Sequence, residues 1–256
     1  MDLGLRKKRA LITGASKGLG AAVASMLAAE GCDLVLVARD LKRLEQLKSQ
    51  INAADSALDV QLIEMDMRAA NACKDVARSA GAVDILINNA GDVASGGLLD
   101  IDEVQWRRAW DLKIFGYINL SREIYRAMVG AGRGVIINIV GTAGERPRGE
   151  RIAVASGNAA LIAFSRALGL ESVGYGVRVV AVNPGPCETD RQLDRLKARA
   201  LEELGAASRW PELVADYPFG RLARPEEIAS VVTFLASERA SYMSATAVTV
   251  DGGGHH

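Results

Sequence analysis

Short apolar runs alternate with longer amphipathic segments along almost the whole chain. Seven of the apolar runs have the length and composition of buried strands, and they cover residues 9–13, 33–38, 60–65, 85–88, 134–139, 177–182 and 247–250. Between them, apolar residues recur with a helical period at about residues 19–30, 41–52, 69–80, 102–129, 154–172 and 225–236. Such alternation is typical of a parallel sheet covered by helices on both faces. We therefore predict an α/β fold, with seven parallel strands in one doubly wound domain spanning residues 1–256.

A glycine-rich turn follows the first predicted strand and reads Thr-Gly-Ala-Ser-Lys-Gly-Leu-Gly from Thr13 to Gly20. Right-handed crossovers bring the carboxyl ends of all strands to one edge of the sheet, where such folds bind ligands. The free N–H groups and the positive dipole end of the helix that follows suit a phosphate. The motif predicts an anion-binding turn, although a tight turn without a ligand has the same local sequence.

The charges of the chain are balanced, with 31 Lys and Arg residues against 31 Asp and Glu residues. No overall field attracts nucleic acid or an anionic membrane, which leaves only a local charged patch open. We expect a small-molecule substrate as the partner, and neither nucleic acid nor a membrane. No apolar run is expected to approach the length of a membrane-spanning helix, and the N-terminus lacks the apolar segment of a signal peptide.

Cysteine and histidine usage indicates a reducing cytoplasm and no metal site. The three cysteines, Cys32, Cys73 and Cys187, are far apart and have neither metal-ligand spacing nor a disulfide framework. The two histidines, His255 and His256, follow three glycines and look like the remainder of an affinity tag. Histidine catalysis is therefore not expected.

The end of the second predicted strand bears on the choice of cofactor. Dinucleotide folds that select NAD place an acidic residue there for the ribose 2′-hydroxyl, whereas this chain has Ala38 followed by Arg39. Together with Lys17 in the glycine turn, Arg39 is suited to flank a 2′-phosphate. These residues favour NADP and leave NAD open, and two ordinary surface cations are the alternative interpretation.

Polar residues also follow the third and fourth predicted strands. Asp66 is placed to accept a hydrogen bond from an adenine amino group, or equally to cap the helix expected near Ala69. Asn89, Ala90 and Gly91 are small and polar where an apolar strand must stop, which suits either the close approach of a ribose or a plain turn.

Two segments near the expected site bear on the substrate. Residues 184–222 form the longest irregular stretch, and we predict a substrate lid at about 186–222, with a surface helix over 190–205 as the plainer interpretation of part of it. The loop 145–151 contains Arg146, Arg148 and Arg151. These arginines suggest an anionic substrate, unless they simply solvate a turn.

Taken together, these motifs resemble those of the short-chain dehydrogenase/reductase family, and the likeness covers essentially the whole chain. It rests on the loop T-G-x-x-x-G-x-G, the segment N-N-A-G, Asn183-Pro184-Gly185 with Thr189, and the runs at 220–229, 234–237 and 250–253. The resemblance implies a Rossmann-like fold and hydride transfer between a nicotinamide cofactor and a carbonyl or alcohol. It also implies a homotetramer or homodimer built on the helices at 102–129 and 154–172.

The resemblance further implies which residues bind the dinucleotide. The phosphates and ribose would contact Gly14, Ser16, Gly18 and Leu19, and the adenine would contact Asp66 and Met67. The adenosine ribose would lie against Asn89, Ala90 and Gly91. The nicotinamide would lie against Pro184, Gly185 and Thr189.

All four catalytic positions of that family hold other residues here. The tyrosine position is Val154, the lysine position is Asn158, the serine position is Gly141, and the helix asparagine is replaced by Lys113. Lysine and asparagine are thus exchanged between two helices. Because burial lowers the pKa of a lysine, one hypothesis makes Lys113 the proton donor and Asn158 a partner of the nicotinamide ribose. In the alternative, Lys113 pairs with a carboxylate such as Asp111 or extends to solvent.

Three functions remain open on these residues. The first is an NADP(H)-dependent oxidoreductase of a small carbonyl or alcohol with a non-standard proton-transfer group. The second is a catalytically inactive dinucleotide-binding protein for sensing or assembly, and the third is a lyase or isomerase with a structural cofactor. We favour the first, since retention of Pro184, Gly185 and Thr189 implies that the nicotinamide ring is oriented.

Overall fold

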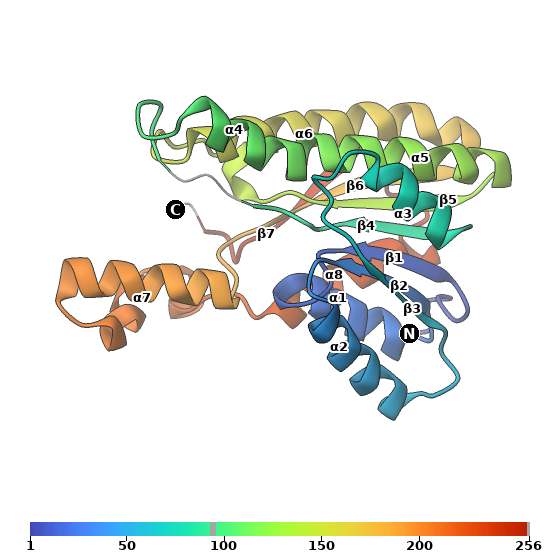
Figure 1. Cartoon of the computed structure of the whole chain (residues 1–256), viewed down its shortest axis with the longest axis horizontal. Helices are drawn as coiled ribbons and strands as arrows, with labels where there is room; N and C mark the ends of the chain where they lie inside the picture. The colour runs from blue at the N-terminus through green and yellow to red at the C-terminus, as the bar shows by residue number, and fades with distance from the viewer. Residues whose placement is uncertain (93–95, 255–256) are drawn as a thin grey trace.

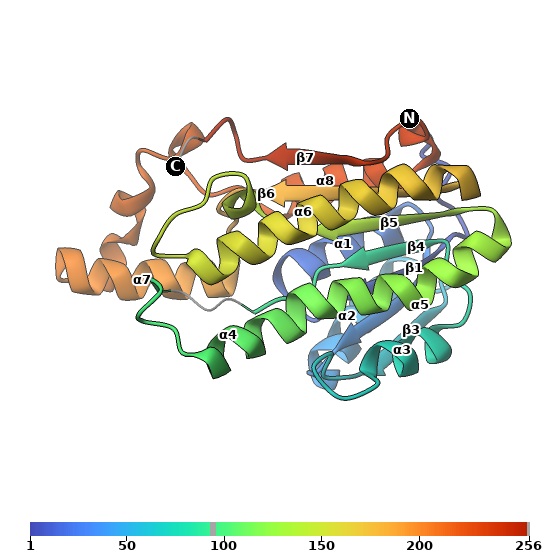
Figure 2. The same cartoon turned by 90° about the horizontal axis from the view of Figure 1, so that it is seen from above.

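A computed structural model describes residues 1–92 and 96–254. Within them, seven parallel strands form one sheet in the order β3-β2-β1-β4-β5-β6-β7, seen from two sides in Figure 1 and Figure 2. The strands are β1 (Arg9–Thr13), β2 (Asp33–Ala38), β3 (Val60–Glu64), β4 (Ile85–Asn88), β5 (Gly134–Ile139), β6 (Val177–Pro184) and β7 (Thr246–Val250). The predicted doubly wound, Rossmann-like fold is confirmed. His255 and His256 lie outside the described residues.

Helices cover the sheet in two layers, one on each face (Figure 1). The first layer holds α1 (Gly18–Ala29), α2 (Leu41–Ala54) and α8 (Pro225–Ala236). The second holds α3 (Ala72–Ala80), α4 (Glu103–Trp110), α5 (Gly116–Ala131) and α6 (Ile152–Ser172). A further helix, α7 (Asp190–Leu204), projects from the edge at which the strands end (Figure 2).

The two layers explain why the strands are apolar along their whole length. In β1, Ala10 and Ile12 pack into a cluster with α1, α2 and α8, whereas Leu11 packs into a cluster with α3 and α5. A strand buried on both faces has no solvent-facing positions to be polar. The continuous apolar runs in the sequence are therefore the signature of this double covering.

The single long helix predicted over residues 102–129 is divided in the structure. Asp102 caps α4 through a capping box with Gln105, and a π-helical segment, Asp111–Phe115, separates α4 from α5. A π turn adds one residue to the helical repeat and shifts the side chains that follow. The apolar period alone did not reveal it, because the chain remains helical on both sides.

The start of the third helix also differs from the prediction. α3 begins at Ala72 instead of near Ala69, since Asn71 adopts a left-handed backbone conformation with φ of 64°. Asp66 does not cap this helix. Its carboxylate accepts hydrogen bonds from the backbone N–H of Arg68 and from the Arg68 Nε, both at 3.1 Å.

Much of the region expected to be irregular between residues 184 and 222 is helical. It contains α7 and a 3₁₀ segment, Ala207–Val214. Leu196, Val214 and Leu222 form a separate small core there, so the projecting segment is held together by its own apolar contacts. The expected surface helix over 190–205 matches α7 to within one residue.

One expectation about hydropathy is wrong. The stretch Ile152–Tyr175, which is α6 and the turn after it, is long and apolar enough to cross a membrane, with 24 residues and a mean hydropathy of 1.3. Half of its apolar window is buried, and Leu161 and Ile162 pack in a cluster with Ala181 of β6. A helix that buries so much of its surface against the sheet is apolar for that reason.

Candidate active site

A cleft of about 970 Å³ opens where the strand order turns back between β1 and β4, at the carboxyl edge of the sheet. Its volume lies near the top of the range of about 300–1,000 Å³ for ligand pockets. Most residues predicted to bind the cofactor line it: Gly14, Ser16, Lys17, Gly18, Leu19, Arg39, Asp66, Met67, Asn89, Ala90, Gly91, Pro184 and Thr189. Gly185 does not line the cleft, and a Cβ there would lie 2.8 Å from the Cβ of Asp251.

The glycine turn is held in place by the end of β4. The Asn89 Nδ2 donates to the carbonyl oxygens of Thr13 and Gly14 at 3.0 and 3.2 Å. In return, the Thr13 hydroxyl accepts the backbone N–H groups of Asn89 and Ala90, each at 3.0 Å. A side chain at Gly14 would come within 2.9 Å of Asn89 and Ala90, so only glycine allows this close packing.

The amino end of α1 is open toward the cleft. Lys17 is the N-cap residue and makes no side-chain capping hydrogen bond, so the first N–H groups of α1 have no capping side chain among the described residues. Gly18 adopts a φ of 56° and leaves the approach to these groups clear of a Cβ. This cradle fits the phosphates of a dinucleotide.

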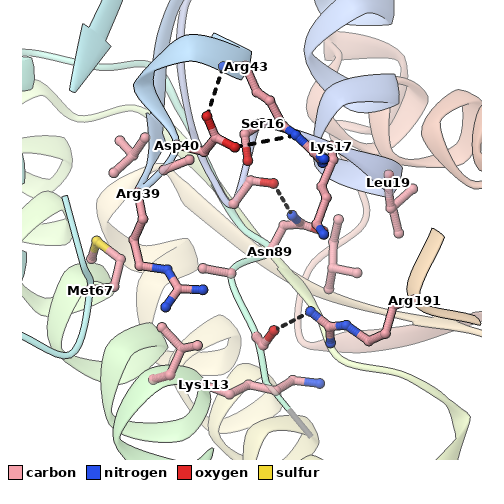
Figure 3. A pocket seen from close by; sticks show the side chains of 18 of the residues that line it. Ser16, Lys17, Leu19, Arg39, Asp40, Arg43, Met67, Asn89, Lys113 and Arg191 are labelled. Carbon is pink, nitrogen blue, oxygen red and sulfur yellow. Dashed lines mark hydrogen bonds and ion pairs between the residues drawn. The ribbon is translucent and has the colours of Figure 1, made fainter. Parts of the chain in front are cut away.

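Cations gather at the β2 end of the cleft (Figure 3). Arg39 is 63% exposed, and its Nη1 lies 3.9 Å from a carboxylate oxygen of Asp66. The Asp40 carboxylate is engaged in capping α2, where it accepts from the Arg43 N–H at 3.0 Å and pairs with the Arg43 Nε at 3.3 Å. Arg43, which no sequence motif indicated, also approaches Asp190 of α7 to 3.9 Å.

The hydrogen bonds of Asp66 favour the ionised form of its carboxyl group. Partial burial opposes the charge, but the backbone and side-chain bonds from Arg68 outweigh it and lower the pKa of the Asp66 carboxyl. A carboxylate at the cleft wall can accept a hydrogen bond from an amino group such as that of adenine.

Thr189 packs against the glycine turn and caps α7. Its hydroxyl caps α7 by accepting the Gln192 N–H at 3.4 Å, and its Cγ2 would lie 3.2 Å from a Cβ at position 18. The projecting segment is therefore attached directly beside the phosphate cradle, and its first turn forms one wall of the cleft.

Lys113 and Asn158 meet at the far end of the cleft. The Lys113 Nζ donates to the Val140 carbonyl oxygen at 2.6 Å and to the Asn158 Oδ1 at 2.9 Å. The Asn158 Nδ2 donates in turn to the Gly141 carbonyl oxygen at 3.3 Å. Lys113 thus donates hydrogen bonds to oxygens at the end of β5 and on α6. The alternative expectation, a pair with Asp111, is not what the structure shows.

The environment of Lys113 disfavours its charge. Burial, followed by the positive charges of Arg151 and Arg191, lowers the pKa of Lys113 to about 7. An amine with this pKa exchanges its proton readily near neutral pH, which is the requirement for a general acid or base.

Close packing of two helices brings Lys113 to this position. Gly157 of α6 lies against the π segment, and a Cβ there would meet Ile114 at 2.8 Å. The Trp110 Nε1 donates to the Ala153 carbonyl oxygen at 2.9 Å across the same contact. A second cavity of about 10 Å³ remains beside Lys113, lined by Asp92, Ala109, Trp110, Lys113, Ile114, Ala153, Val154, Gly157 and Asn158.

Two other residues limit which groups can act here. Gly141 has a φ of 116°, a conformation that L side chains rarely adopt, so a serine would be strained at this position. Tyr117 lines the cleft one helical turn beyond Lys113 and was missed in the sequence analysis. It is buried, and its hydroxyl donates to the Ile139 carbonyl oxygen at 3.0 Å, while burial raises the pKa of the phenol.

The sheet order and the glycine cradle at its carboxyl edge define a Rossmann-type nucleotide-binding protein. The sequence matches the family described as short chain dehydrogenase over residues 8–200. The chain therefore belongs to the short-chain dehydrogenase family.

Named relatives span nearly the full length of the chain. It is 31% identical over 254 residues to a 2,3-dihydro-2,3-dihydroxybenzoate dehydrogenase of Bacillus subtilis, covering 98% of this chain and 97% of the other. It is 35% identical over 247 residues to galactitol 2-dehydrogenase of Cereibacter sphaeroides, covering 95% and 93%. The crystal structure of L-sorbose reductase from Gluconobacter frateurii, complexed with NADPH and L-sorbose, matches with a TM-score of 0.94, 32% identity and coverage of 100% and 99%.

Proposed function

We propose that this protein is an NADP(H)-dependent oxidoreductase that interconverts a small carbonyl compound and its alcohol, with Lys113 as the proton-transfer group. The observation that carries the proposal is the Lys113 ammonium at the end of the cleft, hydrogen-bonded to Val140 and Asn158. Family membership supports the reaction class. The four substituted family positions, Lys113, Gly141, Val154 and Asn158, make the proton-transfer group unusual.

The cleft residues fit the cofactor. The open amino end of α1 suits its phosphates, and Lys17, Arg39 and Arg43 provide cations for a 2′-phosphate. Pro184 and Thr189 would lie against the nicotinamide. The NADPH complex of the similar L-sorbose reductase supports the same choice. When bound, the cofactor supplies or accepts the hydride.

Lys113 can give up a proton without leaving a buried acceptor unsatisfied. An ammonium has three N–H donors, and two of them serve the Val140 and Asn158 oxygens. Because Lys113 also lines the cleft, the third is available to a substrate oxygen. The neutral amine that remains still has two N–H groups for its two acceptors, so no hydrogen bond is lost.

In reduction, the carbonyl carbon gains the hydride and the carbonyl oxygen takes the proton from Lys113, which gives the alcohol. Oxidation runs in reverse, with the neutral amine accepting the hydroxyl proton. Asn158 is buried and bonded to both Lys113 and Gly141. Its part is to orient the ammonium.

The test has two stages. Fluorescence titrations with NADPH and NADH measure cofactor binding, and a screen of carbonyl and enone compounds then measures NADPH oxidation. We expect tighter binding of NADPH than of NADH and turnover of at least one carbonyl compound. Tight NADPH binding without turnover of any compound would count against the oxidoreductase and leave an inactive dinucleotide-binding protein.

We further propose that copies of the chain associate through α5 and α6 as a homotetramer or homodimer in the cytoplasm, and that residues 186–222 act as the substrate lid. Leu170 of α6, followed by Val173 and Tyr175, is 72% exposed, and those two are 57% and 48% exposed; three exposed apolar side chains at one end of the helix support a covered face there. Sedimentation of Leu170→Glu is expected to give a smaller particle than the unchanged chain. Leu201→Glu, on the exposed surface of α7, serves as the control.

A further inference from the structure

We propose that the substrate carries an oxyanion group, a carboxylate or a phosphate, which Arg151 and Arg191 bind beside Lys113. The inference rests on the proposed function, since it names the class of substrate for the same site. Positive charges surround the Lys113 end of the cleft, and one of the arginines there has an unused hydrogen-bond donor.

The side chain of Arg151 carries the argument. Arg151 stands at the start of α6 and is half-buried, and its Nε is shielded from solvent and has no hydrogen-bond acceptor among the described residues. Burying a charged donor without an acceptor costs free energy. Burial, followed by the charge of Arg195, lowers the pKa of Arg151, and Glu150 offsets this only in part. A bound oxyanion would accept a hydrogen bond from the Arg151 Nε, and its negative charge would stabilise the guanidinium.

Two more cations belong to α7: the charge of Arg191 acts on Lys113, and that of Arg195 acts on Arg151. Arg191 lines the cleft and donates through its Nη2 to the Gly91 carbonyl oxygen at 3.0 Å, and Figure 3 shows its guanidinium above Lys113. Arg195 donates to the Gln192 side chain at 2.9 Å. Within the described part of the chain, Arg151, Arg191 and Arg195 form no ion pair with a carboxylate.

The other arginines of the rim loop have different roles. Arg146 pairs with Asp251 at 3.7 Å and donates to the Gly254 carbonyl oxygen, so it ties the loop to the chain after β7. Arg148 is exposed to solvent. The anionic substrate inferred from three arginines in the sequence therefore depends on only one of them, joined by arginines from a different element.

An anion bound here would also raise the pKa of Lys113, the proposed proton donor. Lys113 is flanked by like charges from Arg151 and Arg191, and a bound oxyanion neutralises part of that field. The negative charge favours the ammonium form of Lys113. Substrate binding would therefore protonate Lys113, and reduction consumes that proton. A neutral ketone of the same shape would lack this effect.

The test uses the NADPH-saturated protein, in which the cations of the cofactor end are occupied. Two matched pairs of probes are compared in initial rates and in KM: levulinate with its methyl ester, and dihydroxyacetone phosphate with dihydroxyacetone. We expect at least one anion to have a kcat/KM about 10-fold or more above that of its neutral partner. The pair that shows the difference tells carboxylate from phosphate.

Substitution then locates the preference. Arg151→Gln and Arg191→Gln are each expected to reduce the ratio of anion to neutral kcat/KM about 10-fold, mainly through KM, while leaving NADPH affinity within 2-fold. Arg166→Gln, at an exposed arginine of α6, the helix that follows Arg151, is the matched control and should leave the ratio unchanged. Equal kcat/KM for anion and neutral partner in both pairs, or a preference that survives both substitutions, would overturn the inference.

The outcomes separate this inference from the proposed function. A chain that reduces neutral ketones with NADPH and shows no preference for anions is an oxidoreductase without the oxyanion site. A chain that neither binds NADPH nor turns over any probe contradicts the proposed function first, and the oxyanion site with it.

Discussion

The Lys113 ammonium lies 2.9 Å from the Asn158 side-chain oxygen, so that the π segment between α4 and α5 and the middle of α6 share one hydrogen bond at the end of the cleft. The hydrogen bonds of this pair fix which way the Asn158 amide points. The Asn158 amide oxygen faces the ammonium and its Nδ2 faces the Gly141 carbonyl. This assignment leaves each polar atom of Asn158 with a suitable partner.

Removal of the Lys113 amine should stop catalysis and leave cofactor binding intact. We expect Lys113→Met to lower kcat for carbonyl reduction by about 10²–10⁴-fold, the usual contribution of a positioned general acid. NADPH affinity should stay within 2-fold by fluorescence titration. Lys74→Met, at an exposed site on α3, is the control for the substitution. Unchanged activity in Lys113→Met would remove the residue from its proposed role while the oxidoreductase assignment stands.

The pH dependence follows from the lowered pKa of Lys113, which is about 7. Reduction requires the ammonium form, which predominates below this pKa, so kcat/KM for a neutral ketone should fall as pH rises through about 7. Oxidation of an alcohol requires the neutral amine and should rise over the same interval. Rates measured from pH 5 to 9 check both directions, and a reduction rate that is flat across this range would speak against Lys113 as the acid.

The same pKa shift affects stability. In the unfolded chain the Lys113 amine has its ordinary pKa of 10.5, whereas folding lowers the pKa to about 7. Between these values the unfolded state binds one more proton than the folded state, so the contribution of Lys113 to the free energy of unfolding rises with pH. Denaturant midpoints at pH 7 and 9 should show a smaller increase, or a larger loss, in Lys113→Met than in the unchanged chain.

Arg39 should set the preference for the phosphorylated cofactor. It is exposed at the end of β2, and its only ion pair in the described residues is a long one to Asp66. Charge-assisted hydrogen bonds contribute about 1.5–3 kcal/mol, so Arg39→Ala is expected to weaken NADPH binding by roughly 10-fold or more. NADH affinity should change little. Arg126→Ala, on the exposed face of α5, should leave both affinities unchanged.

Restoring a serine at position 141 should not restore the usual active site of the family. The φ of 116° at Gly141 is strained for any L side chain, and the new Cβ would lie 3.3 Å from the Asn158 Nδ2. We expect Gly141→Ser to lower the free energy of unfolding by about 1–3 kcal/mol and to leave kcat no higher. Ala159→Ser, on the exposed face of α6, controls for the added hydroxyl. An increase in kcat with unchanged stability would show that the loop can rearrange.

Local sequence patterns were sufficient to predict the elements of the sheet. β1, β2, β4 and β5 match the predicted ranges, and β3, β6 and β7 differ by one or two residues at one end. The success has a simple cause, because strands covered on both faces are apolar throughout and are separated by amphipathic helices. The places where prediction failed are local changes of geometry, such as the π segment at Asp111–Phe115 and the left-handed Asn71.

In the candidate site, too, some features could be predicted from the sequence and others depend on the tertiary structure. The glycine turn, the segment Asn89 to Gly91 and the exchange of Lys113 with Asn158 are visible in the sequence, because each is a short motif or lies at a fixed spacing from one. The contact between Lys113 and Asn158, the unpaired Nε of Arg151 and the approach of Arg191 and Arg195 depend on residues that lie far apart in the chain. Spacing along the chain does not determine such distances. They follow from how closely α6 packs on the π segment at Gly157 and from where α7 leaves the sheet after Thr189.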